Sequence, residues 1–377
     1  METRQTGEPM ATSLIEILCE RAEIHEGLDW HRLLESAEIH RLMLPLRLRA
    51  RGAPRSAIPA WVVRELDESF WAWAPKRLAY LELLDRIGTI ASRRGVRLLL
   101  LKGPDLAERL YRIPESRQFR DLDIMVSENH LESLTRALVD HGFVPISGPY
   151  AGLPMDVIRR WELPLTLAHR DAPGLHVDLH LNVTHRLEPY RLDPERFWAG
   201  GRPSRLGFLR LSDDDFLFFL FVHSLKHGYL SLLSFWDLHL ASRDTRLASR
   251  FPAVLQSARS EGYGVLIQVA AELGRRLFGT EWPDAKPLAG RIRWAANWFE
   301  TRARQGHPWI SERAQLMLSA GLLVESMPRL LRYWRLSVLR PPSTIPAQPY
   351  QASPWSNPWA STVRLARSIG RSRGTKG

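Results

Sequence analysis

The sequence predicts an α+β protein, in which a small mixed β-sheet core is flanked along the chain by helical regions. Apolar residues recur at mostly helical spacing over residues 12–93, and helical patterns return after Ser212. Between them, residues 94–183 hold short apolar or alternating runs that are typical of strands. We therefore expect four regions: an N-terminal helical region (1–93), an α+β core (94–211), a C-terminal helical domain (212–340) and a tail (341–377).

The N-terminal region is expected to hold several helices in succession. Gly52, Pro54 and Pro59 interrupt the apolar pattern, so one group of helices ends there. A further helix is predicted from about Trp61 to Arg94, and Pro75 is the position at which it can kink.

The core elements follow from changes of pattern along the chain. VRLLLL at residues 96–101 is a short continuous apolar run, as in a buried strand. Pro104 comes soon after it and suits the first turn of a helix, which we expect to reach about Tyr111. DLDIMV at residues 121–126 alternates in the manner of a strand with one buried face. The remaining elements are predicted as a helix over 129–141 and a strand pair over 164–170 and 174–181.

The C-terminal part begins with a helix-start signal. Ser212 precedes Asp215 by three residues, as in a capping box, so a helix should begin there. Helices are expected to continue to about Arg340, with breaks near Gly228, Pro252, Gly262, Pro283 and Pro308. Residues 341–361 contain six prolines, and this composition predicts a disordered or loosely docked tail.

Composition excludes several classes of protein. The net charge is +11, but residues 340–377 carry six basic residues and no acidic ones, so the body does not demand a nucleic-acid partner. The basic tail could instead contact an acidic partner or a membrane surface. The apolar run Phe216–Val222 is far shorter than a membrane span, and the N-terminus shows no secretory pattern. Cys19 is the single cysteine, and a cytoplasmic protein is the simplest interpretation.

The sequence Asp121-Leu122-Asp123 places two carboxylates on one face of a strand. Side chains at i and i+2 share a face, with Cα atoms about 6–7 Å apart. Such carboxylates repel each other unless a cation lies between them, and Mg²⁺ prefers carboxylate oxygens together with substrate phosphates. Asp121 and Asp123 are therefore candidate metal ligands.

A second strand, HVDLH, repeats this arrangement. His176, Asp178 and His180 share one face, and the intervening apolar residues point the other way. Asp178 is a candidate third carboxylate, since three carboxylates can hold two metals about 3.5–4 Å apart for in-line phosphoryl displacement.

Lys102 and Gly103 stand at a strand end just before a helix, where backbone N–H groups favour an anion. Gly103 would let a phosphate approach the backbone closely. The sequence contains neither a P-loop nor a G-x-G-x-x-G pattern, so neither of those nucleotide sites is expected.

Taken together, these stretches resemble the polymerase-β-like nucleotidyltransferase superfamily, and most closely an uncharacterised nucleotidyltransferase family that has a K-G turn in place of G-S. The resemblance spans about residues 35–245 and includes HRLMLPL at His40–Leu46. Its motifs are K-G-x-x-L-x-x-x-x-Y (Lys102, Gly103, Leu106, Tyr111), R-x-x-x-D-x-D (Arg117, Asp121, Asp123), D-x-H (Asp178, His180), and H-x-x-K-H followed by W-D (His223, Lys226, His227, Trp236, Asp237).

The resemblance implies transfer of a nucleoside monophosphate from an NTP, foremost ATP, to an acceptor with release of pyrophosphate. Asp121, Asp123 and Asp178 would be catalytic and would bind Mg²⁺ or Mn²⁺. The predicted nucleotide-binding residues are Lys102, Gly103, Arg117 and Arg120, and the candidate substrate contacts are His180, His223, Lys226, His227 and Asp237.

Two other functions remain open at this stage. One is a non-catalytic nucleotide-binding or regulatory protein on the same fold, against which the three retained aspartates argue. The other is a glycosyltransferase that uses D-x-D with a nucleotide sugar, against which the strand–K-G–helix element argues. The acceptor, which could be a peptide, a small molecule or a sugar phosphate, the base preference and the oligomeric state are not determined by the sequence.

Overall fold

The computed structural model describes residues 11–146, 153–184, 186, 192–226, 231–285, 288, 290–305, 323 and 327–338. The described residues all belong to one compact unit. The predicted tail and the expected break at Pro308 lie outside the described residues. The division of the body into three regions stays a prediction.

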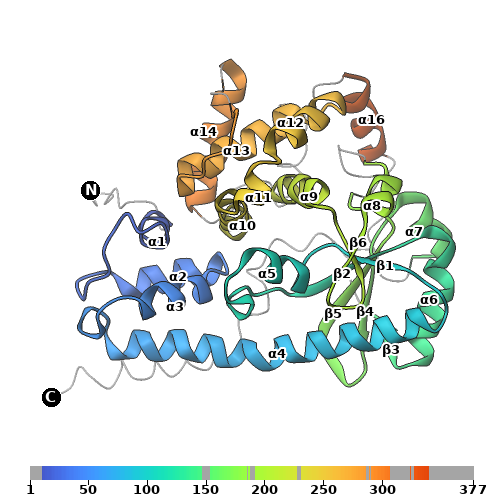
Figure 1. Ribbon diagram of the computed structural model, residues 1–377, viewed down its shortest axis with the longest axis horizontal. Helices are drawn as coiled ribbons and strands as arrows, with labels where there is room; N and C mark the ends of the chain where they lie inside the picture. The colour runs from blue at the N-terminus through green and yellow to red at the C-terminus, as the bar shows by residue number, and fades with distance from the viewer. Residues whose placement is uncertain are drawn as a thin grey trace. The chain divides into compact units, whose positions relative to one another are not determined.

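A seven-stranded mixed sheet lies among helices, which confirms the α+β fold class (Figure 1). The strand order is β3-β4-β5-β2-β1-β7-β6. The strands are β1 (Leu98–Leu100), β2 (Asp121–Val126), β3 (Phe143–Pro145), β4 (Leu165–His169), β5 (Ala172–His180), β6 (Arg202–Pro203) and β7 (Leu209–Arg210). β2 is central: it pairs antiparallel with β1 and parallel with β5.

One face of this sheet is wholly apolar at its centre. Leu100, Ile124 and Leu179 occupy this face on β1, β2 and β5, and all three are buried. The face is covered by two helices, α4 (Ala60–Ser92) and α6 (Glu128–Asp140), which supply much of the same apolar cluster (Figure 1). Because successive side chains of a strand point to opposite faces, the residues between these apolar ones lie on the other face of the sheet.

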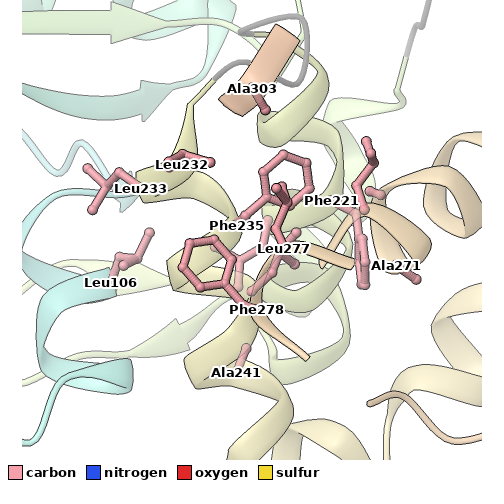
Figure 2. Packing of buried hydrophobic residues seen from close by; sticks show 14 of the residues in the cluster. Leu106, Phe221, Leu232, Leu233, Phe235, Ala241, Ala271, Leu277, Phe278 and Ala303 are labelled. Carbon is pink, nitrogen blue, oxygen red and sulfur yellow. The ribbon is translucent and has the colours of Figure 1, made fainter. Parts of the chain in front are cut away.

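The opposite face contributes to a second apolar cluster, which includes Leu99 and Met125 of the sheet. Leu106 of the segment after β1 belongs to this cluster together with Phe235 and Phe278 of the C-terminal helices (Figure 2). Among the described residues, the other helices before the sheet are α1 (Thr12–Leu18), α2 (Trp30–Ile39), α3 (Met43–Arg51) and the short 3₁₀ turn η1 (Arg55–Ala57). Those around and after the sheet are α5 (Pro104–Leu110), η2 (Pro114–Ser116), α7 (Met155–Trp161), α8 (Pro194–Gly200), α9 (Asp213–Lys226), α10 (Leu232–Arg243), α11 (Thr245–Ala248), α12 (Phe251–Ser260), α13 (Gly264–Phe278), α14 (Gly290–Gln305) and α16 (Met327–Val338).

Local signals explain where several elements begin. The Ser212 Oγ accepts a hydrogen bond from the Asp215 backbone N–H at 3.2 Å, so the expected cap starts α9. The α4 helix runs unbroken through Pro75, which lacks only one backbone donor. The expected break near Pro252 falls between α11 and α12, at residues 249–250, and Pro252 itself lies in the first turn of α12, where proline is tolerated.

Three strands and two helices go beyond the sequence prediction. β3, β6 and β7 contain three residues or fewer, and α7 and α8 contain seven each. Segments this short do not repeat a period of two or 3.6 often enough to be recognised. The strand pair was predicted, but β5 begins at Ala172, two residues before the expected start at Gly174.

The buried His239 on α10 makes stability depend on pH. Burial, with Arg243 and Arg21 nearby, lowers the pKa of His239 to about 4 from an ordinary 6.5. Below pH 6.5 the unfolded chain therefore binds more protons at this histidine than the folded chain does. The free energy of unfolding falls as the pH falls from 6.5 through the folded pKa of about 4. We predict that between pH 7 and pH 5 this group alone lowers the free energy of unfolding by about 2 kcal/mol.

Urea denaturation of the wild type and of His239→Gln at both pH values measures this effect. The variant should lose less stability than the wild type over that interval. Equal losses in the two proteins would contradict the assignment to His239.

Candidate active site

The parallel pairing of β2 with β5 brings the predicted carboxylates together. Asp123 lies directly opposite Asp178 in the register, and Asp121 lies opposite His176. Because Leu122 and Val177 face the apolar cluster under α4, these polar residues share the other face of the sheet. The carboxylates of two strands that are far apart in the sequence therefore converge.

Asp123, Asp178 and His180 offer a compact set of ligand atoms. One oxygen or nitrogen of each lies within 4.8 Å of the others. The His180 Nε2 is 2.9 Å from the Asp123 Oδ1, which fixes that carboxylate. The Asp178 Oδ1 is buried and has no hydrogen-bond partner among the described residues. Carboxylate oxygens suit Mg²⁺ and Mn²⁺, and an imidazole nitrogen is accepted by Mn²⁺, so this donor set fits a divalent metal.

Lys102 neutralises part of this negative charge. Its Nζ lies 3.0 Å from the Asp123 Oδ2 and 3.4 Å from the Asp121 Oδ1. Burial alone would lower the pKa of Lys102, but the two carboxylates outweigh it and raise the pKa above its ordinary value. Lys102 therefore remains charged and belongs to the carboxylate cluster.

The two carboxylates of β2 differ in their electrostatics. Burial and the neighbouring Asp123 raise the pKa of Asp121 to about 6. Burial would also raise the pKa of Asp123, but Lys102 and the hydrogen bond from His180 overcome it and hold that pKa well below its ordinary range. Asp123 is thus the firmly ionised member of the pair, whereas Asp121 would ionise fully once a further cation is bound.

The K-G turn requires its glycine. Gly103 has φ +72° and ψ −118°, a conformation that side chains rarely adopt. A Cβ at this position would lie 3.4 Å from the Asp121 carbonyl oxygen, which is about an ordinary contact, so the backbone conformation rather than a clash requires the glycine. The turn therefore lets the chain leave β1 beside the start of β2 and enter α5, which keeps Lys102 next to the aspartates.

Arg117 lies in a buried ion pair. Its Nε and one terminal nitrogen contact the two Asp237 carboxylate oxygens at 3.0 and 2.8 Å. The Tyr111 hydroxyl donates to the same carboxylate at 2.7 Å. Arg117 was expected to contact nucleotide and Asp237 to contact substrate. In the structure the two residues form an ion pair with each other, which links the segment before β2 to α10. We therefore assign them a positioning role.

The segment that leads into β2 is held by α4. The Trp73 indole N–H donates to the Glu115 carbonyl at 3.1 Å, and the Tyr80 hydroxyl donates to the Arg120 carbonyl. Phe119 packs edge-on against Trp73 with ring centroids 4.9 Å apart. The sequence analysis did not identify these supports, although Trp73 and Tyr80 are seven residues apart and so share one face of a helix.

The other predicted contacts are placed only in part. Arg120 is exposed, and no hydrogen bond or ion pair of its side chain is found among the described residues. His223 is buried on α9 with its ring stacked on Phe219 at 5.4 Å. Lys226 ends α9, but its side chain lies outside the described part, as does all of His227. Substrate contact by these residues stays a prediction.

A mixed sheet that presents clustered carboxylates beside a lysine-glycine turn is the arrangement expected from the resemblance to nucleotidyltransferases. The family model described as "uncharacterised nucleotidyltransferase" matches residues 26–279, and the chain belongs to that family. The family expected from the motifs is thereby confirmed.

No curated protein and no solved structure matches the chain significantly. Among the helices of the described residues, none combines the length and the apolar character that a membrane span requires. The cytoplasmic location stays a prediction.

We predict that Asp237→Ala lowers the free energy of unfolding by about 3–5 kcal/mol. The change leaves the Arg117 guanidinium buried, charged and unpaired. The double variant Arg117→Met/Asp237→Leu removes both charges and should recover most of this loss. Urea denaturation of the three proteins measures both effects, and a single-variant loss below about 1 kcal/mol would contradict the buried pair.

Proposed function

We propose that the protein transfers a nucleoside monophosphate from an NTP to an acceptor and releases pyrophosphate. The observation that carries this proposal is that Asp121, Asp123 and Asp178 share one sheet face, on which Asp123, Asp178 and His180 offer ligand atoms within 4.8 Å of one another. Membership of a nucleotidyltransferase family supports the reaction class. The non-catalytic alternative would not require a carboxylate cluster in which the buried Asp178 Oδ1 has no hydrogen-bond partner among the described residues.

Asp123 and Asp178 would hold a divalent metal, and the partly exposed carboxylate of Asp121 would be a further ligand. The buried Asp178 Oδ1, which has no hydrogen-bond partner among the described residues, supports this assignment. Mg²⁺ or Mn²⁺ bound there would neutralise charge on the triphosphate and polarise the reacting phosphate. His180 would hold Asp123 in place through its 2.9 Å hydrogen bond.

The transfer itself is an in-line displacement at the α-phosphorus. An acceptor oxygen forms the new bond to that phosphorus, and the bond to the bridging oxygen of pyrophosphate breaks, so pyrophosphate leaves with the electron pair. The acceptor proton passes to a carboxylate, for which Asp178 is the candidate because its Oδ1 has no hydrogen-bond donor among the described residues. Positioning and charge neutralisation would supply most of the rate gain.

On the donor side, Lys102 and the Gly103 turn lie next to the carboxylates. Lys102 is ion-paired with both Asp121 and Asp123, so we propose that it stabilises the carboxylate cluster and reaches the phosphates from there. Arg120, at the entrance to β2, is proposed to contact the triphosphate from the exposed side. ATP is the proposed donor.

We predict that Asp123→Asn and Asp178→Asn each reduce metal-dependent transfer by about a thousandfold, because each removes a carboxylate from the charge-neutralising site. The assay follows label from α-labelled ATP, GTP, CTP and UTP into product, with Mg²⁺ or Mn²⁺ and a cell extract as the acceptor source. The labelled product identifies the acceptor.

Asp171→Asn is the matched control, since this carboxylate is 82% exposed at the turn between β4 and β5. It should transfer label as the wild type does. If the two site variants transferred as much label as the control, the proposed function would be wrong. Incorporation from a UDP- or GDP-sugar in place of an NTP would indicate the glycosyltransferase instead.

A further inference from the structure

Arg41 has a backbone conformation that normally belongs to glycine. Its φ is +58°, and it directly follows the C-cap of α2. The Arg41 N–H donates to the Glu38 carbonyl, and the Leu42 N–H donates to the Ala37 carbonyl at 2.7 Å, which is the hydrogen-bond pattern of a Schellman motif. Glycine is the usual residue at this position, so a side chain here is retained at a cost to stability.

The charged side chain at this strained position has no counter-ion in contact with it among the described residues. No hydrogen bond or ion pair of the Arg41 guanidinium is found in this part of the chain, and the residue is only partly exposed. Burial, followed by the nearby charges of Arg120 and Arg117, lowers the pKa of Arg41 to about 10. Asp121 and Asp237 oppose this shift, so the group lies within electrostatic range of both carboxylates. The helix that begins two residues later, α3, contacts η2, the turn just before Arg117, which places this segment beside the chain that leads into β2.

The neighbouring cations divide into two kinds. Arg117 is neutralised by Asp237, and Lys102 is shared between Asp121 and Asp123. Arg41 and Arg120, by contrast, have no ion-pair partner among the described residues. Two unpaired guanidinium groups repel each other, and their proximity becomes favourable when a multivalent anion lies between them.

We infer that Arg41 binds the polyphosphate of the donor nucleotide, together with Arg120. This inference rests on the proposed function and adds a residue from the N-terminal helical region to the site. A polyphosphate fits because a guanidinium fork can bind two phosphate oxygens at once. It also fits because a triphosphate carries more negative charge than one divalent metal neutralises, so further cations would be needed at its β and γ phosphates. Arg41 would thus fix the triphosphate tail, which is common to all NTPs.

Arg41→Gly separates this role from a structural one. Glycine relieves the positive φ, so the variant should have a higher midpoint of urea denaturation than the wild type. It should nevertheless bind ATP and tripolyphosphate about ten- to a hundredfold more weakly in isothermal titration with Mg²⁺ present. Its affinity for Mn²⁺ alone should be unchanged, and Arg41→Lys should restore part of the polyphosphate affinity.

Arg51→Ala is the matched control, because it removes one positive charge from an exposed side chain of α3 and should bind tripolyphosphate as the wild type does. Wild-type affinity for tripolyphosphate in Arg41→Gly would overturn the inference and leave the proposed function intact. An equal loss of Mn²⁺ and tripolyphosphate affinity, with a lower urea midpoint, would also overturn it in favour of a structural role. If the wild type bound neither ATP nor tripolyphosphate with Mg²⁺ or Mn²⁺, the proposed function and this inference would fail together.

Discussion

The structure depends on the groups that offset the electrostatic repulsion between the carboxylates brought together by the sheet. The β2–β5 register places Asp123 beside Asp178, and Asp121 lies two residues earlier on the same face of β2. In a partly buried setting these charges destabilise the fold unless cations or hydrogen-bond donors oppose them. Lys102 and His180 supply that opposition, and the glycine turn after β1 is what brings Lys102 within reach. A metal ion would complete the same balance.

A second buried charge pair extends this organisation to the C-terminal helices. Arg117 lies four residues before Asp121, and its partner Asp237 belongs to α10. The carboxylates of β2 are therefore positioned both by the sheet and by a helix that follows it by more than a hundred residues in the chain. From the other side, Trp73 and Tyr80 of α4 hold the same connecting segment by hydrogen bonds to its carbonyls. The site thus requires helices from both flanking parts of the sequence.

Much of this arrangement follows from local pattern. The alternation in DLDIMV and HVDLH identifies which residues share a face, because a strand permits only two directions for its side chains. The pairing of β2 with β5 does not follow from pattern, since many registers would bury Leu122 and Val177 equally well. The partner of Arg117 could not be predicted either, because an ion pair between residues 117 and 237 depends on how α10 packs.

The strained arginine is the clearest limit of sequence reasoning. The stretch His40–Leu46 carries the family resemblance, but nothing in its residue types indicates that Arg41 has a positive φ or that its charge lies near Asp121. Such a position is visible only once the end of α2 and the charges around it are known. Conversely, Gly103 could be anticipated, because a glycine between a strand and a helix-starting proline usually marks a conformation that other residues avoid.

Metal binding at the β2–β5 carboxylates is the central claim, and Mn²⁺ electron paramagnetic resonance tests it most directly. The spectrum of free Mn²⁺ is followed as the full chain is added, with and without α,β-methylene-ATP, an NTP analogue that cannot be cleaved at the reacting bond. The account predicts that the wild type binds Mn²⁺, that the analogue strengthens this binding, and that an Asp123→Asn/Asp178→Asn double variant loses both effects. Equal Mn²⁺ binding by the wild type and the double variant, unaffected by the analogue, would contradict it.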